Sequence, residues 1–209
     1  LGIDNHSEVL ADFKKILGAE VFEIASLPPC VPGMRLNNKL VATAKNERVD
    51  YVLGSKVTGC TVADGKVVSV TVGTAGAGKE IKADAVVLAG GGFESGALKL
   101  DSHGHLHETI LDLPVTMPEG VKEEDLIHGD YWGSPQPLFL CGVEVDETML
   151  VTYQGKPVHS NVYAAGGVIA GATRWQEKSG EGIALGSAIK AADAILSSVR
   201  AGVATKERN

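Results

Sequence analysis

The chain has 209 residues, of which 44% are hydrophobic and 26 are glycine. This composition fits an α/β domain with many tight turns and argues against disorder. A formal net charge of −7 argues against nucleic acid or an anionic membrane surface as the main partner. No apolar run approaches the roughly 20 residues that cross a bilayer, so we expect no direct insertion into a membrane. Three cysteines that lie far apart in the sequence suit free thiols in the reducing cytoplasm.

The first 50 residues predict two helices with a short strand and a rigid loop between them. Residues 7–17 begin on a capping serine and place their apolar side chains on one helical face, and Gly18 ends this helix. Residues 20–24 favour a strand. The prolines of residues 27–33 forbid both a helix and a central strand, so the second helix is expected at 34–47.

From residue 51 onward the apolar period changes to two, which is typical of strands. The segment 84–89 is continuously apolar, as are the buried strands of parallel sheets, and it is followed by three glycines, Gly90 to Gly92. Asp64-Gly65 predicts a two-residue hairpin turn. The other strands are expected at 51–53, 56–62, 66–72 and 80–82, with a flexible loop at 73–78.

Residues 93–134 are polar and show no clean period, so we expect loops with short strands that leave the main sheet. A metal site is one interpretation of three alternating histidines in this segment, His103, His105 and His107. No carboxylate or cysteine clearly completes a ligand set, and Gly104 favours a loop as much as a strand. We therefore predict no metal. A strand is expected at 138–145, followed by a turn.

The most informative stretch is 161–196. A short buried strand at 162–165 leads into Gly166-Gly167, and a helix opens at 179–182 with the sequence SGEG. The strand at 86–92, VVLAGGG, ends in the same way. Glycines let backbone N–H groups approach a ligand closely. Two such strand ends at one crevice are what a doubly wound nucleotide-binding site needs.

We therefore expect a flavin or dinucleotide cofactor at this crevice. The residues predicted to bind it are Gly166, Gly167, Ser179, Gly180, Gly182 and Ile183. In this interpretation the N–H groups of 180–183 and the positive end of the helix face the N1/C2=O edge of a flavin. They stabilise the negative charge that develops there on reduction. The alternative is that the glycines only cap the helix and pack it against the sheet.

Two arginines, Arg35 and Arg174, are candidates for binding a phosphate or carboxylate substrate, because a guanidinium offers a bidentate fork. A solvated or ion-paired arginine is the alternative. The sequence offers no general base, and no Gly-x-Gly-x-x-Gly follows an N-terminal strand. The first βαβ unit of a flavin or NAD site would therefore come from residues upstream of Leu1, and we expect this chain to be a piece of a longer protein.

The order of several landmarks resembles the B-subunit family of the anaerobic glycerol-3-phosphate dehydrogenases. These landmarks are LPPCVPGMRL at 27–36, the turn at 64–65, the Gly-Gly-Phe at 91–93, LPV at 113–115, SPQPLFLCGVEVDETM at 134–149 and NVYAAG at 161–166. Many flavoproteins carry an acidic residue at the place of Gly167, whereas small residues are also found there in the B-subunit family. The loop that contains Thr173, Arg174, Trp175 and Lys178 departs from the Asp, Pro and Gly that are more common in the family.

The resemblance implies the C-terminal portion of a Rossmann-like FAD/NAD(P)-binding α/β fold, with a smaller β-rich excursion, related to the succinate dehydrogenase and fumarate reductase flavoproteins. It implies a flavin, FMN or FAD, and the oxidation of sn-glycerol 3-phosphate to dihydroxyacetone phosphate with electrons passed to the quinone pool. The partners it implies are a catalytic flavoprotein subunit and a membrane-bound iron–sulfur subunit. The location is then cytoplasmic, with peripheral attachment at the inner face of the membrane through a partner subunit.

Two alternatives to this function are a fumarate reductase-like flavoprotein that acts on a dicarboxylate and a non-catalytic electron-relay or assembly subunit. Considered by parts, residues 1–92 are expected to form a partial flavin-binding α/β region with a hairpin. Residues 93–137 form the loop-rich excursion, and residues 138–209 form the C-terminal strand, loop and helix of the flavin site.

Overall fold

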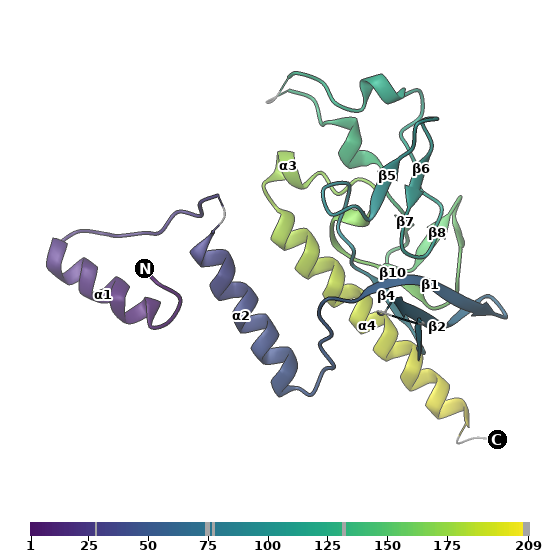
Figure 1. The fold of residues 1–209 in the computed structure, drawn as a ribbon, viewed down its shortest axis with the longest axis horizontal. Coiled ribbons are helices and arrows are strands. Elements are labelled where there is room, and N and C mark those ends of the chain that lie inside the picture. Colours follow the sequence, from purple (N-terminus) through teal and green to yellow (C-terminus); the bar gives the residue numbers. More distant parts are fainter. Residues whose placement is uncertain (28, 74–75, 77, 131–132, 207–209) are drawn as a thin grey trace. The chain divides into compact units, whose positions relative to one another are not determined.

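The computed structural model describes residues 1–27, 29–73, 76, 78–130 and 133–206 (Figure 1). The chain forms two compact units, Leu1–Gly54 and Ser55–Asn209. The boundaries expected at residues 92 and 137 fall inside the second unit, and the three-part division stays a prediction.

The first unit contains two helices, α1 (His6–Leu17) and α2 (Val31–Asn46). As predicted, Gly18 ends α1 in the left-handed conformation, with a φ of 63°, and its N–H donates to the carbonyl of Lys14 at 2.9 Å. The predicted cap at Ser7 is wrong. Ser7 lies inside the first turn, and Asn5 occupies the cap position without a side-chain hydrogen bond.

The segment between these helices also differs from the prediction. Residues 20–24 form no strand, because a strand needs a ladder partner and the described part of this unit supplies none. Helix α2 begins at Val31 rather than at 34, since Pro32 occupies the first turn, where its missing N–H has no helical partner to lose. No residue of α1 or α2 is buried, so these two helices alone do not make a core.

The second unit opens with an antiparallel meander in the order β1-β2-β3, formed by β1 (Lys56–Ala63), β2 (Lys66–Gly73) and β3 (Lys79–Lys82). The predicted turn is confirmed, because Asp64 and Gly65 both have positive φ, 50° and 71°, as a two-residue hairpin requires. The strand expected at 51–53 is absent. The loop expected at 73–78 falls partly on residues 74, 75 and 77, which lie outside the described residues.

The centre of this unit is a parallel pair of strands, β4 (Val86–Leu88) and β10 (Val162–Ala164). The two strands pair in register, with Val86 opposite Val162 and Leu88 opposite Ala164. Both were predicted from their continuous apolar character. The buried core forms around them and consists of Val67, Leu88, Leu98, Leu111, Leu113, Val143, Val151, Val162, Ala164 and Val168.

The excursion between these strands is built from short pieces, as predicted for 93–134. It contains β5 (Leu98–Leu100) paired with β6 (Leu106–Glu108), and the 3-10 turn η1 (Glu123–Asp125). After it come β7 (Glu144–Val145), β8 (Val151–Tyr153) and β9 (Lys156–Pro157) in one antiparallel sheet. The long strand expected at 138–145 is wrong, because Pro137 opens a 3-10 turn, η2 (Pro137–Leu140), and leaves only β7 extended.

Gly142 is the point at which two segments of this unit cross in close contact. It pairs with Thr116 on one side, and the next residue, Val143, exchanges backbone hydrogen bonds with Val168 and Ala170, each 2.9 Å long. A Cβ atom on Gly142 would lie 2.5 Å from both the Ala170 nitrogen and the Val168 oxygen. Position 142 therefore tolerates glycine alone.

Glu108 is a buried carboxylate, with 2% of its surface exposed, at the end of β6. It accepts hydrogen bonds from the backbone N–H groups of Ile110 (2.7 Å), Leu111 (2.8 Å) and Leu113 (3.3 Å). Three donors to one carboxylate offset the cost of removing it from water. This side chain therefore shapes the loop that follows β6.

The chain ends in a long helix, α4 (Gly180–Lys206), which is preceded by the 3-10 turn η3 (Gly166–Val168) and the short helix α3 (Arg174–Glu177). Figure 1 shows α4 running along one side of the central strands, and it contacts both η3 and β10. Ser187 and Ala191 are buried on this side. Apolar residues on the opposite side of the helix are exposed to solvent: Leu185, Ile189, Leu196 and Val199.

By length and composition alone, one helix in the described part of the chain, Gly180–Arg200, is apolar enough to cross a membrane. The expectation that no segment approaches such a length was wrong, because Lys190 and Asp193 interrupt the apolar run without lowering its mean hydropathy enough. A helix that is apolar on every side is typical of a buried core helix as well as of a membrane span. The contacts of α4 with η3 and β10 place its inner side in the core of the α/β unit.

Candidate functional site

The carboxyl ends of β4 and β10 lie side by side, and this edge carries the candidate site. The N–H of Ala165 donates to the carbonyl of Leu88 at 2.9 Å, so the parallel pairing continues to the last residue before the glycines. Gly90–Gly92 and Gly166–Gly167 therefore leave the sheet at the same edge. This confirms the prediction that the two glycine-ended strands meet at one crevice.

Gly166 turns the chain sharply where β10 ends. Its φ of 76° lies in the left-handed region that favours glycine. Its N–H donates to the hydroxyl of Ser187 at 2.9 Å, and that hydroxyl donates to the carbonyl of Ile183 at 2.6 Å. The glycine corner is thus fastened to helix α4. We did not predict this role for Ser187, although a lone serine on the inner, apolar side of α4 is the sequence signal that marks it.

Arg174 spans the mouth of the crevice. Its guanidinium donates to the carbonyl of Gly167 at 3.2 Å and to the carboxylate of Glu94 at 2.5 Å, and it lies 5.2 Å from the centre of the Phe139 ring. A Cβ atom on Gly167 would lie 2.4 Å from one guanidinium nitrogen, and one on Gly92 would lie 3.0 Å from the other. Both glycines therefore make room for this arginine.

The predicted ion-paired state of Arg174 is thus the one observed, since 21% of its side chain is exposed and its partner is a carboxylate. Glu94 and Phe139 were not predicted as part of the site. Glu94 lies 80 residues from Arg174 in the sequence, and no local pattern connects the two. The signal was only that Glu94 follows the glycines at the end of β4.

The first turn of α4 supplies the second half of the crevice. The N–H of Ile183 donates to the carbonyl of Ser179 at 2.8 Å and is engaged within the helix. Gly180, Glu181 and Gly182 precede it and carry the N–H groups that a helix leaves without internal partners. A Cβ on Gly182 would meet nothing within 4 Å. The open donors therefore belong to 180–182, and Ile183 contributes its position rather than its N–H.

Hydrogen bonds hold the short loop before α4 in place. Glu177 accepts from the hydroxyls of Ser179 (2.7 Å) and Thr173 (2.8 Å). These two hydroxyls, Ser179 first, lower the pKa of the Glu177 carboxyl below its ordinary value. The Ser179 side chain is therefore occupied by Glu177, so it is available to a cofactor only through its backbone.

A hollow of about 520 Å³ opens between these elements. Its walls are formed by Glu94, Phe139, Arg174, Lys178, Gly180 and Glu181. One aromatic ring, two cations, two carboxylates and a helix N-terminus thus face one space. Such a mixture is typical of a ligand site with an apolar surface and a few polar groups that fix orientation.

The other residues singled out in the sequence lie elsewhere. Arg35 is in the first unit, where it is ion-paired with Glu23 and donates to the carbonyl of Gly2 at 2.6 Å. The Arg35 guanidinium lowers the pKa of Glu23 below its ordinary value, and the N-terminal ammonium, 3.1 Å away, adds to this effect. His159 precedes β10 and therefore lies at the end of the strand opposite the crevice.

The three histidines of the excursion do not line one strand. Only His107 lies in β6, while His103 lies in the turn that contains Gly104. Asp101 organises them instead. It accepts from the backbone N–H groups of His103 (2.8 Å) and His105 (2.9 Å), and its carboxylate lies 2.9 Å from the ring of His107. The described residues contain no group of three or more side chains suited to a metal ion.

Parallel strands that end in glycines, followed by a turn and the N-terminus of a long helix, define an α/β protein that binds a nucleotide-type cofactor at the carboxyl edge of its sheet. The chain matches the model of the FAD binding domain family over residues 1–183, and it belongs to this family. Its fold is that of an α/β flavoprotein, and its cofactor is a flavin.

The curated relatives carry one name, that of the anaerobic glycerol-3-phosphate dehydrogenase B-subunit. The chain is 29% identical over 197 residues to the probable B-subunit of this enzyme from Halobacterium salinarum (strain ATCC 29341 / DSM 671 / R1). It is 29% identical over 203 residues to the B-subunit of Actinobacillus pleuropneumoniae serotype 5b (strain L20) and 27% identical over 199 residues to that of Haemophilus influenzae (strain 86-028NP). The resemblance predicted from the sequence is thereby confirmed.

These matches cover 93% of the chain but 45% of each relative. The chain thus spans about half the length of the curated relatives it matches. No solved structure matches the chain.

The residues of the crevice fit a flavin. Gly92 and Gly167 have no side chain to block the edge of the sheet, and Gly182 faces open space. The N–H groups of 180–182 suit the acceptor atoms of a flavin ring or a phosphate. The crevice is occupied in part by the Arg174 guanidinium, which must keep its place or exchange its partners when a ligand enters.

Proposed function

We propose that this chain is the flavin-holding part of an anaerobic glycerol-3-phosphate dehydrogenase B-subunit and represents a C-terminal portion of its Rossmann-like fold. The reaction is the oxidation of sn-glycerol 3-phosphate to dihydroxyacetone phosphate, with electrons passed to the quinone pool. The observation that carries the proposal is the match of 93% of the chain to proteins of that name, together with the paired glycine-ended strands. The partners are then a catalytic flavoprotein subunit and a membrane-bound iron–sulfur subunit, and the location is the cytoplasmic side of the membrane.

A flavin supplies the acceptor for a hydride or for electrons when it is bound. The chain's own groups have three tasks in this scheme. Gly166 and Ser187 fix the corner where the cofactor rests. The first turn of α4 directs N–H groups and its positive dipole end at the space where negative charge grows on reduction. Its preorganised donors favour the reduced cofactor without moving.

Arg174 binds the substrate phosphate in this proposal. Its guanidinium already holds a carboxylate, that of Glu94, and a phosphate offers the same fork of acceptors with more charge. The carbonyl of Gly167 and the ring of Phe139 keep the guanidinium in place while its anionic partner changes. Glu94 thereby acts as the resting partner of the arginine.

The visible absorption spectrum of the protein, purified without oxygen, tests the function. We expect flavin bands near about 450 nm that bleach on addition of sn-glycerol 3-phosphate, but not on addition of its enantiomer. Arg174→Ala is expected to raise the concentration for half-bleaching about tenfold or more, because a charge-assisted pair is lost. Arg200→Ala, an exposed arginine on α4, is the matched control and should leave that concentration unchanged.

The other outcomes separate the alternatives. Bands that bleach with a reduced dye and reoxidise with fumarate, but ignore glycerol 3-phosphate, indicate a dicarboxylate flavoprotein. Bands that persist with either substrate and bleach only when a reduced partner is added indicate an electron relay. A colourless protein that takes up neither FAD nor FMN would contradict the proposal at its base.

A further inference from the structure

The outer edge of β4 has no strand beside it in the described part of the chain. Strand β4 belongs to a sheet of two strands, with β10 as its neighbour. The N–H of Val86 donates to the carbonyl of Asn161, and the carbonyl of Leu88 accepts from Ala165, each at 2.9 Å. These residues therefore turn their polar groups toward β10. Because backbone groups alternate along a strand, Val87 presents its N–H and C=O at the other edge.

An apolar groove follows this edge. It has a volume of about 480 Å³, and the six consecutive residues 85–90 form one of its walls. The facing wall comes from the meander and from the loop after β6, with Val57, Val70, Ile110 and Leu111. The side chain of Val87 is 40% exposed. A row of unpaired backbone groups between apolar walls is the chemistry that another β-strand recognises.

The environment of β4 also differs from that of a finished parallel sheet. Such sheets are buried on both faces and usually contain more than two strands. Helix α4 covers β10, yet its own outer side is a second apolar stripe, with Leu185 63% and Ile189 52% exposed. A helix that is apolar on two opposite sides is normally covered on both. The relatives contain more than half of their length beyond the part that this chain matches.

We propose that the outer edge of β4 is the docking site for one further parallel β-strand, supplied by the part of the fold that the relatives contain and this chain does not match. The strand pairs with the N–H and C=O of Val87, and its apolar side chains fill the groove. Its direction follows that of β4 and β10, so its carboxyl end lies beside Ala89 and Gly90 at the edge of the crevice. The chain segment that follows the strand covers the outer stripe of α4.

The test is reconstitution of the 209-residue chain with a polypeptide made from the unmatched part of the Halobacterium salinarum relative, followed by hydrogen exchange. We expect a one-to-one complex in which exchange of the Val87 and Ala89 amides slows at least about tenfold relative to the chain alone. The amides of Val86 and Leu88, already turned toward β10, should change far less. No flavin is needed for this readout, so it fails or succeeds independently of the proposed function.

A substitution sharpens the result. Val87→Pro removes the N–H that faces the groove, and proline is tolerated at a sheet edge. We expect it to weaken the complex about tenfold or more, the effect of losing one backbone pair and the register that it fixes. Lys79→Pro is the matched control, because Lys79 is the exposed first residue of the edge strand β3 and lies outside the groove. It should bind as the unchanged chain does.

Three results would overturn the proposal. The first is a chain that dimerises on its own with Val87 protected, since a second copy then occupies the edge. The second is a complex that leaves the Val87 amide unprotected or binds Val87→Pro with unchanged affinity, since the contact then lies elsewhere. The third is no complex at all.

Discussion

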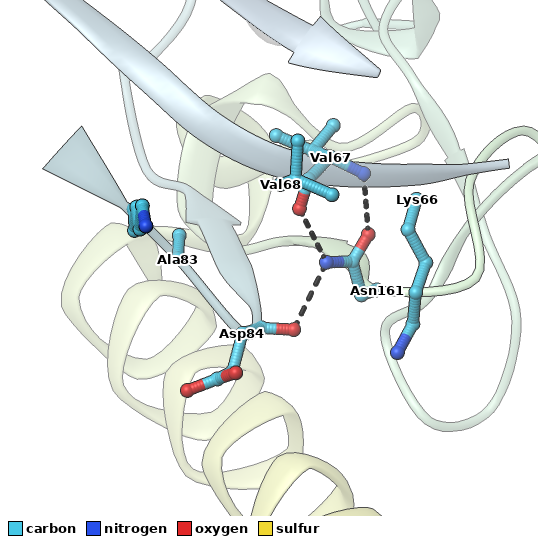
Figure 2. Close-up of a pocket in the computed structure, with 7 residues that line it drawn as sticks. Lys66, Val67, Val68, Ala83, Asp84 and Asn161 are labelled. Atoms are coloured by element: carbon cyan, nitrogen blue, oxygen red, sulfur yellow. Dashed lines mark hydrogen bonds between the residues drawn. The ribbon is translucent and has the colours of Figure 1, made fainter. Parts of the chain in front are cut away.

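The side chain of Asn161 and the backbone of Val67, 94 residues apart, exchange two hydrogen bonds. The N–H of Val67 donates to Oδ1 at 2.9 Å, and Nδ2 donates to the Val67 carbonyl at 2.7 Å. Nδ2 also donates to the carbonyl of Asp84 at 2.9 Å. Figure 2 shows this amide between the start of β2 and the chain that enters β4, beside a cavity of about 270 Å³. One side chain thus ties the meander to both strands of the central pair.

Asn161→Ala should therefore destabilise the second unit strongly. The change leaves a buried N–H and two carbonyls without their partner, and each unsatisfied buried group costs about 1–3 kcal/mol. We expect the free energy of unfolding to fall by about 2–4 kcal/mol, measured by urea denaturation. Ser160→Ala, at the exposed neighbouring position, is the control and should change it by less than about 0.5 kcal/mol. An Asn161→Ala protein as stable as this control would show that the three bonds contribute little.

Glu108→Gln tests the buried carboxylate. Glutamine keeps the shape of the side chain but replaces one acceptor oxygen with an NH₂ group, which faces backbone donors from Ile110, Leu111 and Leu113. We expect a loss of about 2 kcal/mol in the free energy of unfolding. Glu119→Gln, at an exposed position of the same excursion, should be neutral. An equal effect of the two changes would mean that the three N–H groups find other partners.

A double-mutant cycle tests the close approach of Gly167 and Arg174. Gly167→Ala alone places a methyl group 2.4 Å from the guanidinium, so it should displace Arg174 and lower the melting temperature. In an Arg174→Ala background the same methyl group meets empty space, and the penalty should largely disappear. We expect a coupling of about 1–2 kcal/mol between the two positions, measured by thermal unfolding. Additive effects would show that Arg174 does not rest on Gly167 in solution.

Asp101 gives a prediction for pH. The hydrogen bond from His107, followed by that from the backbone of His105, holds the pKa of Asp101 far below its ordinary value of 3.8. A lowered pKa in the folded state means that this carboxylate stabilises the fold at pH values above 3.8 and that its contribution is lost as the pH falls further. Asp101→Asn should therefore be less stable than the unchanged chain at about pH 6, with the gap closing toward about pH 2. Urea midpoints across this range provide the measurement, and a gap that is constant with pH would contradict the assignment.

The sequence predicts the parts of the fold whose signals are local. The continuous apolar strands β4 and β10 and the turn at Asp64-Gly65 follow from patterns within about six residues of each position. The failures are local patterns overruled by their surroundings. The strand expected at 20–24 finds no partner, and Pro137 turns the start of another expected strand into η2. A proline also opens α2 three residues earlier than expected.

The crevice shows the same division. Its glycines and the first turn of α4 are contiguous in the sequence and were predicted together. Glu94 and Ser187 complete it through contacts with Arg174 and Gly166 over 80 and 21 residues, and such pairs depend on the folded geometry rather than on spacing. The ion-paired state of Arg174 was foreseen as an alternative, whereas the identity of its partner was not.

The crossing at Gly142 connects regions that are far apart along the chain. Since the next residue, Val143, is bonded to Val168 and Ala170, the path that leaves the glycine corner is laid directly on the segment returning from the excursion. A single hydrogen atom in place of a methyl group sets how near these segments come. The width of the cofactor crevice is therefore governed partly from outside it, at a position that no ligand touches, and variation among related chains at 142 should be accompanied by a different course of 168–170.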